Sequence, residues 1–169
     1  VIALITLFSH TPVSVGADTY YTGANGDWTT ALDWTNGQPG TADRGNVNNR
    51  LTVNITTDVG TINALRVGTA GNSTDGEGTI IIGGVLTIAD GGGTGADVTI
   101  GSGAFKGTLR IINGGTLTSN NAGADGEIYI GQNNGSDGIL LLDNGTINAN
   151  RAFYVADGTG STGTVTIGD

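Results

Sequence analysis

Residues 78–82 read GTIII, and the same kind of run returns three more times along the chain. The later copies are GTLRI at 107–111, GILLL at 138–142 and GTVTI at 163–167, at intervals of 29, 31 and 25 residues. A weaker first copy, LTVNI, occupies residues 51–55. A repeat of this length, built from short β-type runs separated by Gly, Asn and Asp, predicts one supersecondary unit stacked on itself.

Each unit contains two further β-type runs, such as VLT at 85–87 and VTIG at 98–101. Apolar residues alternate with polar ones in these runs, which indicates one buried and one exposed face. The inward positions of successive units line up in four aliphatic columns. These columns are Ile80, Leu109, Leu140 and Val165; Ile82, Ile111, Leu142 and Ile167; Val67, Ile100, Ile130 and Val155; and Ile62, Leu86, Leu117 and Ile147.

The columns predict an all-β protein, a right-handed parallel β-solenoid (β-helix) of about five three-stranded coils of 25–31 residues. Glycine accounts for 32 of the 169 residues, and together with Asn and Asp it suits the tight corners of such a fold. A β-sandwich of hairpins is the alternative, because strands separated by turns also fit it. The similarity between successive units favours the solenoid.

The composition excludes several classes of function. The chain has 15 acidic against 6 basic residues and a formal charge of −9, so nucleic acid is not an expected partner. It contains no cysteine, which excludes disulfides, thiol catalysis and cysteine-ligated zinc. His10 is the single histidine. A Ser-His-Asp triad and histidine-ligated metals are therefore not expected in the rest of the chain.

The first residues have the character of a signal peptide. Residues 1–8 read VIALITLF, an apolar run too short for a transmembrane helix, and residues 15–17 read VGA. We therefore expect residues 1–17 to be a signal-peptide remnant cleaved after Ala17, and the protein to be secreted. The alternative is a strand that adds to a neighbouring sheet. Because the chain does not begin with Met and ends within a coil, we also expect it to lack both natural ends.

Residues 18–50 differ from the repeats of 51–169 and are expected to form an N-terminal lead-in. They contain Trp28 and Trp34, followed by Pro39 and Asp43. This pattern resembles the start of secreted bacterial β-solenoid proteins of the autotransporter-passenger type, with their associated β-strand repeats. The resemblance covers about residues 20–169 and implies export to the cell surface. From the residues themselves, both tryptophans are expected to cap the first coil; the alternative is exposed rings that stack on glycans.

No catalytic constellation is expected. A polysaccharide-cleaving solenoid needs carboxylates on adjacent coils aimed at one groove. Here the matching positions of successive units are not acidic: they are Arg66, Thr99, Tyr129 and Tyr154. Calcium is the only cofactor that the pattern leaves open, because oxygen ligands lie in Gly-rich turns. Those ligands are Asp75, Glu77, Asp125, Glu127 and Asp157.

These observations predict a secreted structural or adhesive protein without catalysis, namely a surface stalk, a passenger or an extracellular filament subunit. The alternative is a carbohydrate-binding or polysaccharide-active β-helix. Expected partners are further copies, through the solenoid ends or the N-terminal strand, and surface glycans. The chain is not expected to span a membrane.

Overall fold

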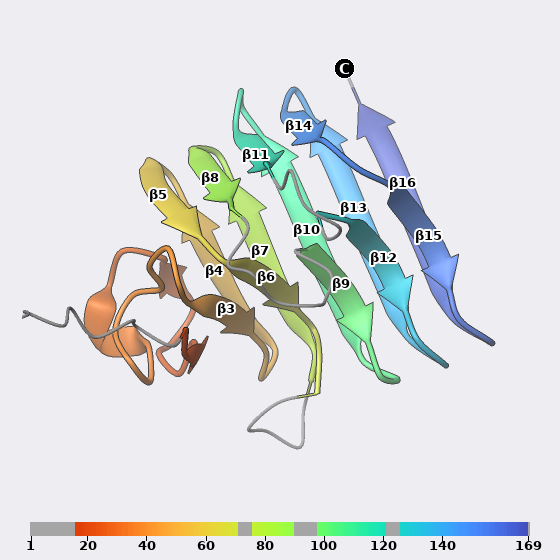
Figure 1. The fold of residues 1–169 in the computed structure, drawn as a ribbon, viewed down its shortest axis with the longest axis horizontal. Coiled ribbons are helices and arrows are strands. Elements are labelled where there is room, and N and C mark those ends of the chain that lie inside the picture. The colour runs from red at the N-terminus through yellow and green to blue at the C-terminus, as the bar shows by residue number, and fades with distance from the viewer. Residues whose placement is uncertain (1–15, 71–75, 90–97, 121–125, 169) are drawn as a thin grey trace, which may run out of the picture.

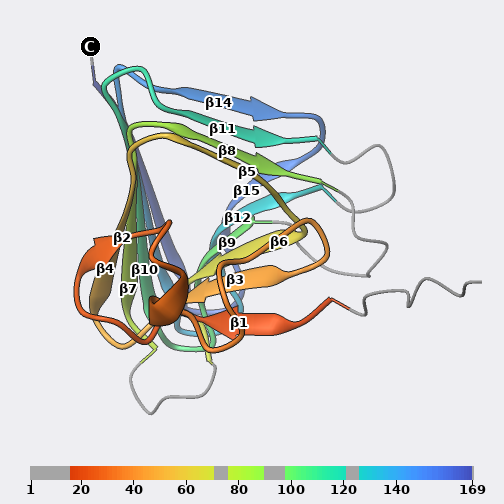
Figure 2. The same cartoon turned by 90° about the vertical axis from the view of Figure 1, so that its left-hand side faces the viewer.

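The structure, a computed structural model, describes residues 16–70, 76–89, 98–120 and 126–168. Its regular elements are strands, apart from the short 3-10 helix η1 (Ala31–Asp33). The strands form three parallel sheets that enclose one core, as the three sides seen end-on in Figure 2 show. The predicted parallel β-solenoid is confirmed. Residues 1–15, which hold most of the predicted signal peptide, lie outside the described residues.

Each sheet collects one strand from successive coils. The first sheet contains β1 (Asp18–Tyr20), β3 (Arg44–Val47), β6 (Ala64–Val67), β9 (Val98–Ser102), β12 (Ile128–Gln132) and β15 (Phe153–Asp157). The second contains β2 (Gly26–Asp27), β4 (Leu51–Ile55), β7 (Gly78–Ile82), β10 (Lys106–Ile112), β13 (Asp137–Asp143) and β16 (Thr162–Gly168). The third contains β5 (Asp58–Ile62), β8 (Val85–Ile88), β11 (Thr116–Ser119) and β14 (Thr146–Ala149).

About five coils lie side by side in Figure 1, from the orange strands to the blue ones. The first coil is β3–β4–β5 and the fourth is β12–β13–β14; β15 and β16 form the last. β1 and β2 pair with β3 and β4 ahead of the first coil. The sheets therefore begin within the lead-in 18–50, and residue 50 lies inside the first coil.

The inward columns of the first and second sheets run along the stack in register. In the second sheet, Leu109 lies between Ile80 and Leu140, and Leu140 pairs with Val165. Two further columns follow the same pattern: Ile82, Ile111, Leu142 and Ile167 in the second sheet, and Val67, Ile100, Ile130 and Val155 in the first. Val53 and Ile55 extend the two second-sheet columns to β4. The central members are fully buried, so these columns form the core.

The third-sheet column departs from the predicted register at one position. Leu117 pairs with Leu86 and with Ile147, but Ile62 pairs with Ile88 rather than with Leu86. The register shifts between Asp58 and Thr61, where β5 holds one more residue than β8. Gly60 lies in this stretch with a φ of 81°, as expected for an extra residue in a β-bulge. The predicted pairing of Ile62 was therefore wrong because of this bulge.

Glycine begins the four later copies of the repeat, where two backbone segments meet at the corner between the first and second sheets. A Cβ atom at Gly107 would lie 2.3 Å from the carbonyl oxygen of Val67 and 2.3 Å from the amide nitrogen of Gly101. Gly101 itself has a φ of 74°, which most residues avoid. Glycine at these starts lets the coils approach to the spacing of paired strands, whereas the first copy begins with Leu51.

Candidate functional site

The two tryptophans lie in a buried aromatic cluster at the N-terminal end of the stack. Trp28 is 0% exposed and Trp34 is 4% exposed, and Tyr21 lies beside them. The ring centroids of Trp28 and Trp34 are 4.6 Å apart, and those of Tyr21 and Trp34 are 5.1 Å apart, both edge to face. The indole N–H of Trp34 donates a 2.9 Å hydrogen bond to the carbonyl oxygen of Trp28.

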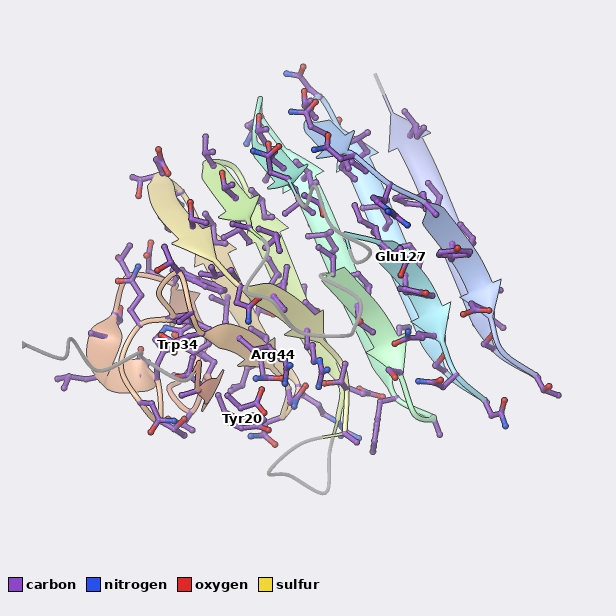
Figure 3. The ribbon with its side chains drawn as sticks, viewed as in Figure 1. Tyr20, Trp34, Arg44 and Glu127 are labelled. Carbon is purple, nitrogen blue, oxygen red and sulfur yellow. The ribbon has the colours of Figure 1, made fainter. Side chains whose placement is uncertain are left out.

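The cluster covers the inner side of the first coil. Trp28 packs against Gly45 of β3, where an added Cβ atom would lie only 2.7 Å from the indole ring. Figure 3 shows Trp34 among the side chains at this end. Neither indole presents a face to solvent, so the hypothesis that Trp28 or Trp34 stacks on a glycan was wrong. The hydrophobic driving force buries both rings because the first coil offers them an apolar surface.

The carboxylates do not gather into a metal site in the described part of the chain. No group of three or more His, Cys, Asp or Glu side chains lies close enough there to hold an ion. The carboxylate of Glu127 instead accepts a 3.2 Å hydrogen bond from the hydroxyl of Tyr129, and Glu77 lies 3.5 Å from Arg50. Asp75 and Asp125, two of the predicted calcium ligands, lie outside the described residues.

The outer face of the first sheet brings together the side chains that the repeats predicted to be equivalent. One outward column crosses the six strands of this sheet in register and consists of Tyr20, Asn46, Arg66, Thr99, Tyr129 and Tyr154. The rings of Tyr129 and Tyr154 stack with centroids 4.8 Å apart and planes inclined by 16°. Burial, and then the negative charge of Glu127, raise the pKa of Tyr129 to about 12.

A pocket of about 240 Å³ opens beside this column on the same face. Its walls come from three successive coils, because β6, β9 and β12 lie next to one another in the sheet. All but one of its lining residues have polar side chains, and one is charged. The lining residues are Arg66, Thr69, Ala70, Thr99, Ser102, Gln132 and Asn133.

One residue of the lining, Thr69, and its neighbour Asn48 each have a buried polar atom without a hydrogen-bond partner among the described residues. Thr69 is 4% exposed, and Asn48 beside it is 3% exposed. The amide N–H of Thr69 donates a 3.1 Å hydrogen bond to the side-chain oxygen of Asn48. Among the described residues, the hydroxyl of Thr69 and the side-chain nitrogen of Asn48 have no hydrogen-bond partner. Buried polar groups are normally paired, so the Thr69 hydroxyl is the group in the lining with an unused hydrogen bond.

Arg66 supplies the positive charge of the pocket. Among the described residues, it forms no ion pair, whereas the neighbouring Arg44 pairs with Asp18 at 2.9 Å (Figure 3 labels Arg44). Burial, followed by the guanidinium of Arg44, lowers the pKa of Arg66 from its ordinary value. The arrangement places a partly desolvated cation beside neutral hydroxyl and amide groups.

The sequence identified Arg66 and Thr99 as equivalent positions but not the pocket itself. Thr69, Ser102 and Gln132 each follow an aliphatic-Gly pair in their units, at residues 67–68, 100–101 and 130–131. The glycines have positive φ angles. This aliphatic-Gly-polar pattern is the signal that marks the residues returned to the outer face after each corner.

The chain matches no protein-family model and shows no significant similarity to a curated protein or a solved structure. The described structure is a parallel β-solenoid, and the narrower resemblance to autotransporter-type passengers stays a prediction. Within the described residues, no helix has the length and apolar character needed to cross a membrane.

Proposed function

We propose that this chain is a secreted or surface-exposed structural solenoid that acts as a rigid spacer, as a passenger stalk or as a filament subunit. The observation that carries the proposal is the register of the second-sheet core columns, which continues without a break from β7 to β16. A solenoid of stacked coils resists bending because parallel strand pairs hold each coil to the next. Its length sets the distance over which it holds whatever is attached to its ends.

Composition supports an exposed location. The formal charge of −9 favours solubility, and stability that comes from stacked columns needs no disulfide. The resemblance of residues 20–169 to exported bacterial solenoids points the same way. An antibody against this chain is expected to detect it in the medium or on intact producing cells. Detection only inside lysed cells would contradict the proposed location.

The proposed role involves no catalysis. Carboxylates in the described residues are spread over turns and strand ends, and several are engaged in structural contacts, such as Asp33 with Tyr21. Incubation with plant and bacterial polysaccharides is expected to release no reducing sugar. Release of sugar that depends on a particular Asp or Glu would contradict the proposal and favour a polysaccharide-active β-helix.

The rigidity of the stack is tested by small-angle scattering. With about five coils spaced as paired strands, the stack is roughly as long as its strands, so we expect the profile of a compact folded particle. The profile is expected to stay the same between low and high ionic strength. A profile typical of a flexible or unfolded chain would contradict the spacer role.

Self-association through the C-terminal coil is the filament version of this role. The inner side chains of β15 and β16, including Val155, Val165 and Ile167, are exposed, whereas the aromatic cluster covers the other end. For the filament version we propose that a second copy pairs through β15 and β16, coil against coil, by hydrogen bonds between strand edges. Ile167→Lys is expected to shift sedimentation toward the monomer, and Leu32→Lys at the covered end is the matched control. Equal sedimentation of both variants and the parent chain would contradict this contact.

A further inference from the structure

The pocket on the outer face of the first sheet has features of a binding site. Its polar side chains converge from three coils, and among the described residues the buried hydroxyl of Thr69 in its lining has no hydrogen-bond partner. Leaving a buried hydroxyl without a partner is costly, whereas completing its hydrogen bond with a ligand atom removes that cost. This site does not depend on the spacer role, since a spacer needs no ligand.

The positive charge of the pocket indicates that the ligand carries a negative charge. Arg66 is the only charged residue among those that line it, and the neighbouring Arg44 is already paired with Asp18. A guanidinium binds a carboxylate through two parallel hydrogen bonds, and this pairing strengthens as water is removed. The ligand is therefore expected to carry a carboxylate.

The neutral polar residues of the lining indicate which other groups the ligand carries. Thr99, Ser102, Gln132 and Asn133 offer hydroxyl and amide groups that both donate and accept hydrogen bonds. Asn133 donates a 2.9 Å hydrogen bond from its amide nitrogen to the hydroxyl of Ser102, which holds these two side chains in place. A ligand with several hydroxyl groups around a carboxylate matches this surface.

Size limits the ligand to about one sugar ring. The pocket of about 240 Å³ is smaller than the roughly 300–1,000 Å³ that is typical of drug-sized ligands. The ring of Tyr129 lies in the next strand beside Thr99 but is not among the residues that line the pocket. Ala70 is the one apolar residue in the lining, as expected for a mainly polar ligand.

We propose that this pocket binds a single uronic-acid unit, with its carboxylate on Arg66 and its hydroxyl groups on Thr69, Ser102 and Gln132. The sequence indicated the tryptophans as an alternative place for a glycan contact, whereas the pocket lies on the outer face of the first sheet. Stacking on a tryptophan needs no charge on the sugar, but binding at Arg66 needs a carboxylate.

The first test is titration of isotope-labelled protein with sodium D-glucuronate, followed by NMR. We expect chemical-shift changes centred on Arg66, Thr69 and Ser102, and about tenfold weaker binding of D-glucose, since one charge-assisted pair is worth about a factor of ten or more. Equal binding of glucose, or no binding of glucuronate, would overturn the proposal. Inorganic phosphate is the second anion; tighter binding of phosphate than of glucuronate would also overturn it.

Thr69→Val separates binding from folding. Valine has the shape of threonine without the unpaired hydroxyl, so the melting temperature is expected to stay the same or to rise while glucuronate binding weakens about fivefold. Arg66→Gln is expected to lose the preference for glucuronate over glucose. Thr87→Val, on the outer face of the third sheet, is the matched control. If the Thr69→Val variant binds glucuronate as well as the Thr87→Val control does, water alone occupies the pocket and the proposal is overturned.

Discussion

The inward side chains of the core columns are buried at the N-terminal end of the stack and exposed at the C-terminal end. In the column of the second sheet, Leu109 is 0% exposed and Leu140 is 2% exposed, but Val165 in the last coil is 39% exposed. Ile167 in the neighbouring column is 75% exposed. At the other end, the aromatic cluster around Trp28 covers the first coil, and Val47 and Val53 stay fully buried.

This difference shows that an inward residue of a solenoid is buried only where a neighbouring coil covers it, whatever its own type. An aliphatic residue at an inward position contributes its full stabilisation only where both neighbouring coils are present. Stability is therefore expected to be highest in the coils of β7 to β13 and to decrease toward β15 and β16. The aromatic cluster acts in place of a neighbouring coil at the N-terminal end.

The largest expected effect compares two positions of one column. Ile130→Asp places an unpaired charge in the buried interior and is expected to cost more than about 4 kcal/mol of unfolding free energy, which abolishes folding. Val155→Asp, at the paired position in the exposed last coil, is expected to leave a folded protein. Circular dichroism melting curves measure both. Similar melting temperatures for the two variants would contradict the difference between interior and end.

The next effect concerns the covered end. Trp28→Ala removes the largest buried side chain of the cluster and is expected to cost about 3–5 kcal/mol. Leu32→Ala, at an exposed residue of the same lead-in, is the control and is expected to change stability by less than about 0.5 kcal/mol. Urea unfolding followed by tyrosine fluorescence compares the two. If Trp28→Ala is as stable as Leu32→Ala, the cluster does not act as a cap.

A smaller effect is expected at the glycine corners. Gly107→Ala forces a methyl group against backbone atoms 2.3 Å away and is expected to cost about 1–3 kcal/mol. A Cβ atom at Gly168, in the last coil, meets nothing closer than 3.8 Å, so Gly168→Ala is expected to be neutral. The midpoints of thermal unfolding of the two variants measure this difference in stability. A neutral Gly107→Ala would mean that the coils are further apart at this corner.

The smallest effect is a dependence on alkaline pH at the covered end. Burial, and then the hydrogen bond from its hydroxyl to Asp33, raise the pKa of Tyr21 to about 12, above the value of about 10 in an unfolded chain. The folded state therefore favours the neutral phenol, and its contribution to stability is complete below pH 10 and is lost as the pH rises to about 12. Tyr21→Phe is expected to reduce this alkaline loss, measured by melting temperature against pH. An unchanged loss would show that Tyr21 is not its source.

Much of the fold follows from the sequence because two simple rules act in every unit. Alternation of apolar and polar residues sets the inward columns, and glycine at the corners sets where each strand begins. These rules placed Leu109, Leu140 and Ile130 correctly. They failed at Ile62, because the bulge at Gly60 adds one residue that no repeat period contains.

The candidate site was harder to predict because it depends on contacts between coils. The sequence marked Trp28 and Trp34 as aromatic but gave no indication of whether the first coil would bury them. Arg66 and Thr99 were found as equivalent positions, yet the pocket also needs Thr69 and Gln132, which reach the outer face through positive-φ glycines at the corner. An unpaired hydroxyl such as that of Thr69 is visible only once its neighbours are in place.

Amide hydrogen exchange, measured coil by coil by mass spectrometry, shows whether neighbouring coils supply the stability of each coil. Among the second-sheet strands of the coils, we expect the slowest exchange in β7, β10 and β13, slow exchange in β4, which the aromatic cluster covers, and the fastest exchange in β16. Exchange reports local opening, so it separates a stack stabilised by neighbouring coils from a uniformly stable domain. Equal protection of β10 and β16, or faster exchange in β4 than in β16, would contradict this expectation.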